Sequence, residues 1–270
     1  MSSISLPSVN RPPKNRAGFS MAVRQTLTMA RRSLLKVRRT PEHLFDVTFQ
    51  PILFILMFTY IFGGAVAGDA QGYLPMIVPA ILIQTLVGAS VASGVQLRDD
   101  MDKGVFDRFK AMPIARVAPL AGILLADMVR YAIAAVLTFG MGFLIGYRPE
   151  GGIAGVALAI VFSICCAWAL SWIFAFFGVI ARDAASVQGI SMVVLFPLMF
   201  VSNAFVPVET MPGWLRWFAE INPISHMITA VRGMVNQGTM NADFAISLLG
   251  AAAIVAIFAP IAVRVYMRRV

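Results

Sequence analysis

The sequence predicts an all-α integral membrane protein with six transmembrane helices. The first observation is composition: of 270 residues, 59% are hydrophobic and 13% are charged, whereas about 25% of the residues of an ordinary soluble domain are charged. The second is that the apolar residues are gathered in stretches of about 20 residues, the length that a helix needs to cross a bilayer. The third is that Lys and Arg are concentrated in the polar segments on one side of these stretches.

The chain begins with a polar, proline-containing segment, residues 1–17, which we expect to be a disordered tail. Residues 18–40 predict an amphipathic helix, because apolar side chains recur on one face at spacings of three and four. That face comprises Val23, Leu27, Ala30, Leu34 and Val37. The arginines lie largely off it, so the helix suits the membrane interface, with its charges near anionic headgroups. An ordinary surface helix packed on protein is the alternative.

Residues 41–270 form the predicted six-span transmembrane domain. The spans are expected at residues 47–66, 74–95, 118–147, 153–180, 187–204 and 244–265. Short glycine-rich links separate the first span from the second and the third from the fourth, and glycine is typical of such turns.

Basic residues predict the orientation of the spans. Nine precede the first span, five lie between the second and third, one lies between the fourth and fifth, and three close the chain, so eighteen of the 22 Lys and Arg fall on one side. By the positive-inside rule this side is cytoplasmic, and both termini lie there. The rule also explains the net charge of +9, so no nucleic-acid partner is expected.

The largest predicted cytoplasmic loop, residues 97–116, contains a short amphipathic helix. Its apolar face comprises Met101, Val105, Phe106, Phe109 and Met112. Asp99 and Asp100 are expected at its N-cap or in its first turn, and Pro113 is expected to end it. The charge of the loop is mixed, which favours a protein partner over the alternative, a loop that lies on the lipid surface.

The segment 204–240, between the fifth and sixth spans, predicts a re-entrant hairpin on the outer side. Prolines interrupt its apolar sequence, an amphipathic stretch follows, and an Asn-Pro pair precedes a second short helix. A proline-broken apolar segment at membrane depth is tolerated only where protein or a water-filled cavity surrounds it. We therefore expect this hairpin to dip part-way into the bilayer beside a pathway. Its landmarks are Pro207, Glu209, Trp214, Trp217, Asn222, Pro223 and Arg232.

Two charged residues lie within the third span. Asp127 and Arg130 are three residues apart, so they share a helix face, and charges at this depth are costly and usually functional. One interpretation is an ion pair that neutralises both charges, and the other is a position at the inner mouth of a transport path. In the second span, small residues from Gly88 to Gly94 permit close helix contact, within the subunit or with a second copy.

Several motifs are absent from the sequence. It contains no Gly-x-x-x-x-Gly-Lys-Ser/Thr phosphate loop and no His-Glu-x-x-His zinc motif. Cys165 and Cys166 are adjacent within an apolar run, so they indicate neither a disulfide framework nor a metal site. We therefore expect a chain that is not an enzyme by itself and that binds no metal or cofactor.

The landmarks of the hairpin occur in an order that resembles the permease subunits of type-2 ATP-binding-cassette exporters, a family of drug, lipid and polysaccharide transporters. The similar positions are Phe196-Pro197, Pro207-Val208-Glu209, Pro212, Trp214, Asn222-Pro223 and Arg232. Residues 97–116 are similar too, with an acidic-basic run, Gly104 and a Met-Pro-Ile-Ala-Arg exit. Within the family, the chain most resembles the daunorubicin-resistance type permeases.

The resemblance implies two permease copies, identical or related, around a central cavity, with a separate ATPase subunit that binds ATP and Mg²⁺. Residues 97–116 would dock on that subunit through Asp102, Gly104, Phe106, Asp107, Arg108, Phe109 and Pro113. The candidates for the substrate pathway are Gln84, Ser90, Phe196, Met199 and Asn203. Of these, Gln84 and Asn203 also suit the role of hydrogen-bond partners between helices. The hairpin landmarks would form an outer gate.

The expected function is outward movement of a hydrophobic drug or lipid-like substrate across the plasma membrane, in contact with membrane lipids and driven by the ATPase subunit. Export of a cell-envelope lipid or glycan is the alternative within the family. A non-transporting membrane scaffold or an ATP-independent channel is the alternative of a different class. A channel would be favoured by polar faces that repeat along several spans, and these spans are nearly all apolar.

Overall fold

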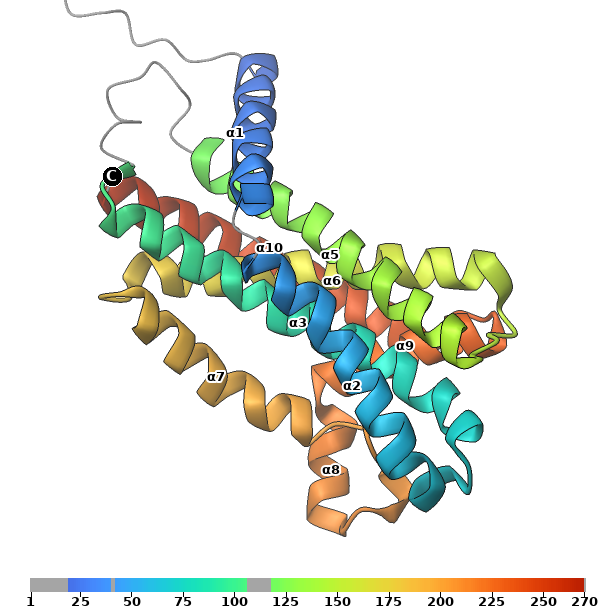
Figure 1. Ribbon diagram of the computed structural model, residues 1–270. Coiled ribbons are helices and arrows are strands. Elements are labelled where there is room, and N and C mark those ends of the chain that lie inside the picture. The colour runs from blue at the N-terminus through green and yellow to red at the C-terminus, as the bar shows by residue number, and fades with distance from the viewer. Residues whose placement is uncertain (1–18, 40–41, 106–117, 270) are drawn as a thin grey trace, which may run out of the picture.

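The computed structural model of the protein describes residues 19–39, 42–105 and 118–269, in which the regular secondary structure is helical (Figure 1). The long helices are α1 (Phe19–Arg39), α2 (Glu42–Ala67), α3 (Ala70–Asp102), α5 (Ala118–Ile145), α6 (Gly152–Ile180), α7 (Ala184–Phe200) and α10 (Ala242–Arg269). Between α7 and α10 lie the 3-10 helix η1 (Val208–Thr210), α8 (Gly213–Ile221), α9 (Pro223–Arg232) and the π-helix η2 (Gly233–Gln237).

Five of the described helices, α2, α3, α5, α6 and α10, are long and apolar enough to cross a membrane. The sixth, α7, is a shorter apolar helix of 17 residues. Each expected span falls on one of these helices, so the predicted all-helical architecture is confirmed. Two expected segments, the tail 1–17 and most of the loop 97–116, lie outside the described residues.

The second span extends further toward the loop than expected. Helix α3 continues through Asp99 and Asp100 to Asp102, so the prediction that these aspartates begin a separate helix is wrong. Two ion pairs of i,i+4 spacing explain the extension, one between Arg98 and Asp102 and one, of 2.6 Å, between Lys103 and Asp99. Such pairs stabilise the last turns of a helix that has already left the apolar region.

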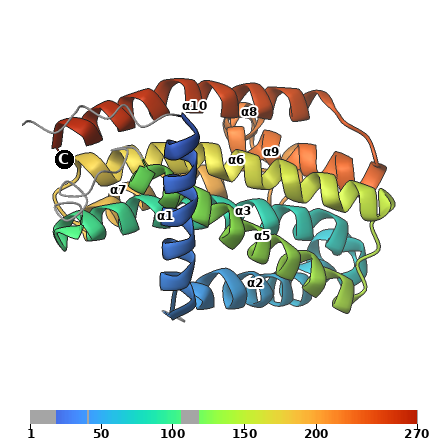
Figure 2. The same cartoon turned by 90° about the horizontal axis from the view of Figure 1, so that it is seen from above.

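Helix α3 is the centre of the bundle. It packs against α2, α5, α6, α7 and α9, and Figure 2 shows α5 and α6 on one side of it with α7 behind. Of its most apolar window, 78% is buried inside the protein, against 11% for α10. Helix α10 is therefore peripheral and covers α6, whereas α3 supplies the largest share of the main hydrophobic core.

Small residues allow α3 and α6 to cross at very short distance. A Cβ atom added to Gly94 would lie 2.1 Å from the carbonyl oxygen of Phe174, and one added to Gly178 would lie 2.4 Å from the carbonyl oxygen of Gly94. The two backbones are thus in direct contact, the kind of packing that glycine makes possible between membrane helices. The small residues of the second span therefore serve contact within the subunit at Gly94.

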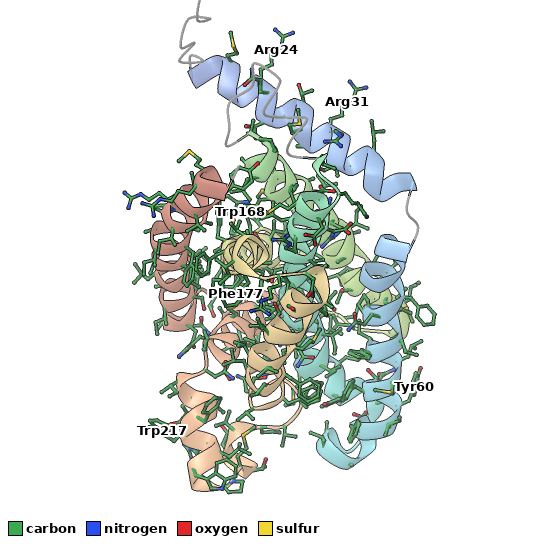
Figure 3. All side chains as sticks on the ribbon, turned by 90° about the vertical axis from the view of Figure 1, so that its left-hand side faces the viewer. Arg24, Arg31, Tyr60, Trp168, Phe177 and Trp217 are labelled. Atoms are coloured by element: carbon green, nitrogen blue, oxygen red, sulfur yellow. The ribbon has the colours of Figure 1, made fainter. Side chains whose placement is uncertain are left out.

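Helix α1 lies across one end of the bundle (Figure 3). It packs on the first turns of α5, where Gly122 faces Met29 and Ala30, and Ala30 is buried. Leu27 remains 55% exposed, and Arg24 and Arg31 point away from the bundle (Figure 3). This arrangement agrees with an interfacial helix that packs on protein at one point and leaves apolar side chains for lipid; the side chains of Val23 and Val37 lie outside the described residues.

We expect Gly94→Ala to destabilise the protein by about 1–3 kcal/mol, because the new methyl group overlaps the backbone of α6 and forces α3 and α6 apart. Gly88→Ala is the matched control in the same helix, since a Cβ atom there would meet only the methyl group of Met199, at 3.7 Å. Thermal unfolding of the detergent-solubilised protein measures both. Equal stability of the two variants would contradict the close crossing at Gly94.

Candidate functional site

The segment predicted as an outer hairpin begins where α7 ends. Pro197 lies within the last turn of α7, and the amide of Val201 donates to the carbonyl of Pro197 at 2.8 Å, which closes the helix. The chain then passes through η1 into α8, at the outer end of the molecule, and turns back into the bundle as α9 (Figure 1). The predicted pair of short helices is therefore present, one on each side of Asn222.

Asn222 joins α7 to α9. Its side-chain amide donates to the carbonyls of Leu198 and Val201, both at 2.7 Å. Leu198 lies in the last turn of α7 and Val201 is its C-cap, where intrahelical donors run out. Its side-chain oxygen accepts from the amide of Ile224 at 2.9 Å and so caps α9. Pro223 occupies the first position of α9, where its missing amide hydrogen costs nothing.

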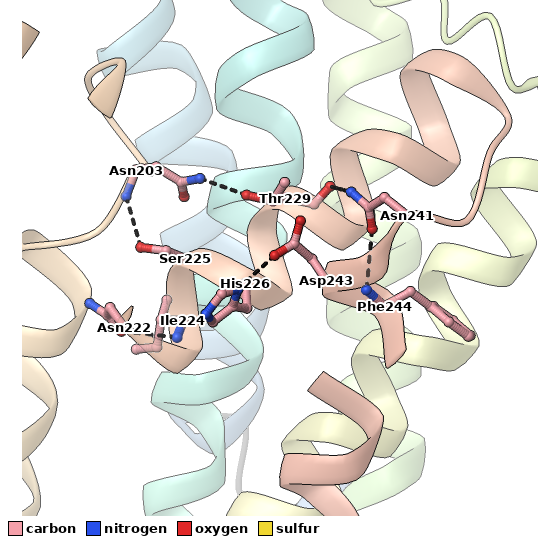
Figure 4. A network of polar contacts seen from close by, with 9 residues as sticks. All are labelled: Asn203, Asn222, Ile224, Ser225, His226, Thr229, Asn241, Asp243 and Phe244. Atoms are coloured by element: carbon pink, nitrogen blue, oxygen red, sulfur yellow. Dashed lines mark hydrogen bonds and ion pairs between the residues drawn. The ribbon is translucent and has the colours of Figure 1, made fainter. Parts of the chain in front are cut away.

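A polar network ties α9 to the segments on either side of it (Figure 4). The Asn203 side-chain amide donates to the Thr229 hydroxyl at 2.8 Å, and the Asn203 backbone amide donates to the Ser225 hydroxyl at 3.2 Å. The Asn241 side-chain amide donates to the Thr229 carbonyl at 3.1 Å. His226 Nδ1 lies 2.6 Å from an Asp243 carboxylate oxygen, which links α9 to the start of α10.

Arg232, at the end of α9, is bound entirely by backbone carbonyls. Its guanidinium donates to Met76 of α3, from Nε at 3.2 Å and from Nη2 at 2.8 Å. It also donates to the carbonyls of Asn203 at 2.9 Å and Ala204 at 3.2 Å. One side chain thus connects α3, α9 and the segment that follows α7.

The other hairpin landmarks lie apart from this network. Pro207 precedes η1, and Glu209 is exposed. Trp214 and Trp217 of α8 are 74% and 63% exposed, and Trp217 lies at the outer edge of the molecule (Figure 3). The hairpin therefore has two parts, an amphipathic α8 that faces outward and an α9 that is buried against α3, α6 and α10.

The candidates for the substrate pathway differ in burial: Gln84, Ser90 and Asn203 are buried, Met199 is partly buried and Phe196 is exposed. Gln84 of α3 is buried and donates to the Met199 carbonyl of α7 at 3.3 Å, close to where Asn203 contacts α9. Ser90 is fully buried and donates to the Val87 carbonyl of its own helix at 2.6 Å. Phe196 is 59% exposed on α7, so it does not share a site with Ser90.

Aromatic rings form a continuous row at the outer end of α7. The ring centroids of Phe196 and Phe200 are 4.4 Å apart, and Phe200 is 5.6 Å from Phe205. Phe205 in turn lies 4.4 Å from Phe58 of α2. Sequence reasoning identified only the first member of this row, because the contact between α2 and the segment after α7 joins residues that are far apart in the chain.

Asp127 and Arg130 form an ion pair in the N-terminal half of α5. Their charged atoms are 3.2 Å apart, and both side chains are 4% exposed. Two residues of α3 complete the arrangement: the Ser93 hydroxyl donates to the Asp127 carboxylate, and the Ala89 carbonyl accepts from Arg130 Nη2 at 2.8 Å. The pair is thus part of the packing between α3 and α5.

Only the start of the predicted coupling segment is described. Asp102 ends α3 and pairs with Arg98, whose Nη1 also donates to the Ala181 carbonyl at the end of α6, at 3.0 Å. The hydrogen bond to the Asp99 carboxylate raises the pKa of Lys103. Gly104 has a φ of +64°, a conformation that favours glycine. The other predicted coupling residues lie outside the described residues: Phe106, Asp107, Arg108, Phe109 and Pro113.

Metal-binding chemistry is not apparent in the part of the chain that the structure describes, because no three His, Cys, Asp or Glu residues gather there. The polar groups described above instead bind backbone carbonyls or one another. The arrangement holds neighbouring helices together.

The family model described as ABC-2 type transporter matches residues 24–235. That range begins in α1, includes the loop before α5 together with Asn222 and Arg232, and ends in η2. The chain belongs to the ABC-2 type transporter family. As an ABC transporter permease, it is a multi-pass membrane protein and is not itself the ATPase, and membership implies an ATP-binding subunit as its partner.

Relatives of this permease cover most of its length. The daunorubicin resistance ABC transporter permease protein DrrB1 of Streptomyces coeruleorubidus is 41% identical over 254 residues, which are 94% of this chain and 90% of the relative. The "Probable doxorubicin resistance ABC transporter permease protein DrrC" of Mycobacterium tuberculosis is 24% identical over 231 residues, 84% of this chain and 83% of the relative. The doxorubicin resistance ABC transporter permease protein DrrB of the same species is 25% identical over 201 residues, 72% and 70%.

We expect Asp127→Asn to destabilise this permease by about 3–5 kcal/mol, because it leaves the buried Arg130 without its counter-charge. The double variant Asp127→Leu with Arg130→Met, which removes both charges, should recover most of the loss. Membrane abundance and the midpoint of thermal unfolding measure the effect. Equal losses in the single and double variants would show that the ion pair is not its source.

Proposed function

We propose that this permease is the transmembrane subunit of an exporter that moves a hydrophobic drug or lipid-like substrate outward. A separate subunit would bind ATP and Mg²⁺ and supply the energy. The names of the relatives support a drug as substrate, since they refer to resistance to daunorubicin and doxorubicin. The family match supports the division of labour between two kinds of subunit.

The observation that carries the proposal is the aromatic row of Phe196, Phe200, Phe205 and Phe58, the outer aromatic row, whose first two members are exposed. It follows the outer part of α7 and reaches α2. Phe196 and Phe200 are 59% and 53% exposed, so their faces are available to a ligand. Aromatic rings stack on flat apolar molecules with ring centroids about 4.5–7 Å apart, which suits a hydrophobic aromatic substrate.

The exposed side of α7 supports a second permease copy. Only Val187, Ser191 and Leu195 of this helix are buried, whereas Val193 is 76% exposed. An apolar helix that packs through one narrow stripe has room for a partner on its other face. We propose that two copies, identical or related, face each other across α7 and α3 and enclose a cavity into which the outer aromatic row opens.

The proposed setting is the plasma membrane, with six spans and both termini in the cytoplasm. The distribution of basic residues supports this orientation, and the exposed arginines of α1 would then face anionic headgroups of the inner leaflet. In this orientation α8 lies at the outer surface, where tryptophans such as Trp214 and Trp217 favour the interface. We propose that α8 and α9 together close the cavity on the outside.

We propose that residues 97–116 dock on the ATPase subunit. Helix α3 carries this segment at its inner end, and Arg98 ties the same point to the end of α6. A movement of the docked segment would therefore reach two central helices at once. The paired carboxylates of Asp99 and Asp102 would orient the contact at its rim.

Phe200→Ala should reduce the ATP-driven uptake of a fluorescent hydrophobic drug into inverted vesicles that contain the permease and its ATPase, which measures export. The loss of one stacked ring predicts a two- to tenfold higher apparent KM. Leu249→Ala is the matched control, because Leu249 is 71% exposed on the peripheral helix α10. An unchanged KM for Phe200→Ala at normal membrane abundance would contradict a substrate site at the outer aromatic row.

Replacing Phe106 and Phe109 together by Ala should weaken binding of the ATPase and uncouple ATP hydrolysis from export, while the permease still inserts in the membrane. Burial of one such ring is worth roughly 1.5–3 kcal/mol, and aromatic anchors often dominate an interface. Co-purification of the ATPase with the variant measures the effect. Undiminished recovery together with normal coupled hydrolysis would place the contact in another loop.

A further inference from the structure

The outer end of α3 contains two prolines, Pro75 and Pro79, inside the helix. A proline has no amide hydrogen, so the carbonyl four residues before it loses its intrahelical donor. For Pro79 that carbonyl belongs to Pro75. The first turns of α3 thus present a carbonyl that needs a hydrogen-bond donor from elsewhere.

The donor comes from the π-helix that follows α9. The side-chain amide of Asn236 donates to the Pro75 carbonyl at 2.9 Å. The hydroxyl of Tyr147, just after α5, donates to the side-chain oxygen of Asn236 at 2.5 Å and so orients the amide. One residue further along α3, the Met76 carbonyl accepts two hydrogen bonds from Arg232.

Arg232 reaches α3 without a carboxylate partner among the described residues. Its guanidinium is held between the Met76 carbonyl on one side and the Asn203 and Ala204 carbonyls on the other. Guanidinium presents several donors in a fixed fork, so this grip depends on the relative position of three backbone segments. Sliding α3 along the hairpin by a few ångströms would break these hydrogen bonds together with that of Asn236.

We propose that Arg232 and Asn236 are positioning residues that latch the outer hairpin to α3 and release it when α3 moves. Helix α3 runs without interruption from this latch to Asp102, where the segment that we place against the ATPase begins. A displacement at the inner end is therefore carried to the Pro75 and Met76 carbonyls. The role in export rests on the proposed function, whereas the hydrogen bonds of Arg232 and Asn236 to α3 are present in the structure.

Pro79→Ala separates the latch from a general structural role. Alanine restores an amide hydrogen four residues after Pro75, so the Pro75 carbonyl regains a donor within α3 and no longer needs Asn236. Asn236→Ala should then weaken the attachment of the hairpin to α3 in the natural sequence and have little effect on it in the Pro79→Ala background. A role of Asn236 in folding alone predicts the same effect in both backgrounds.

The test uses the full chain with its ATPase, with Cys165 and Cys166 replaced by Ala and with Ser202→Cys as a reporter. Ser202 is 1% exposed and lies beside the carbonyls that Arg232 holds, and Ser→Cys is nearly isosteric. An impermeant thiol reagent is applied to intact cells. Asn236→Ala should raise the labelling rate about three- to tenfold, the factor expected for the loss of one hydrogen bond, and less than twofold in the Pro79→Ala background.

Two further variants test whether the effect comes from the hydrogen bond of Asn236. Tyr147→Phe removes only the hydroxyl that orients Asn236, so it should raise labelling in the same direction without a folding defect. Gln237→Ala, at the neighbouring exposed position of η2, should leave labelling unchanged. Equal labelling of Asn236→Ala and its parent, equal effects in the two Pro79 backgrounds, or an increase with Gln237→Ala as large as with Asn236→Ala would each overturn the latch.

Export is measured separately in the same variants. The latch predicts fewer substrate molecules exported per ATP hydrolysed in Asn236→Ala, with hydrolysis itself preserved. Absence of export by the parent protein would contradict the proposed function and leave the labelling result standing. A parent that exports normally, with labelling unaffected by Asn236→Ala, would instead contradict the latch alone.

Discussion

Backbone carbonyls that lack an intrahelical donor govern the outer half of this permease. A chain at membrane depth must satisfy its backbone polar groups within the protein, because lipid offers no donors. Here the last turn of α7 and the proline-containing start of α3 present carbonyls that their own helices leave free. Asn222 binds the first set, and Asn236 binds the Pro75 carbonyl at the start of α3. Arg232 adds a contact to the neighbouring Met76 carbonyl. The side chains that hold the hairpin in place therefore also supply the hydrogen-bond donors that α7 and α3 lack.

Helix α3 brings the functional elements of the molecule onto one axis. Its C-terminal end carries the segment proposed to meet the ATPase. About two turns before that end, Gly94 touches the backbone of α6. Its middle supplies Ser93 and Ala89 to the buried ion pair of α5. Its outer end bears the carbonyls that anchor the hairpin. Because a helix with this much close packing moves as a unit, a shift at one end has consequences at the other.

Helix α7 differs from α3 in its length, its packing and the residues on its exposed face. It is short, it is packed through a single stripe, and its exposed face carries aromatic rings that continue to α2. Loose packing beside a rigid axis is the arrangement expected where a permease must accommodate a substrate and a second subunit. Gln84 joins α3 to α7 through a hydrogen bond, and Asn203 joins the segment after α7 to α9.

Much of this architecture follows from the sequence alone, because its causes are local. Apolar length determines the six helices, Asn222-Pro223 determines where α9 begins, and the spacing of Asp127 and Arg130 determines that they share a helix face. Other features needed the tertiary structure. The continuation of α3 to Asp102 depends on side-chain pairs that stabilise a helix beyond its apolar part, and the separation of Trp214 from Arg232 depends on which short helix is buried. Asn236 had no distinguishing pattern of its own. Pro79 was the available signal that a carbonyl lacks a donor, but only the approach of distant segments in space decides which side chain supplies it.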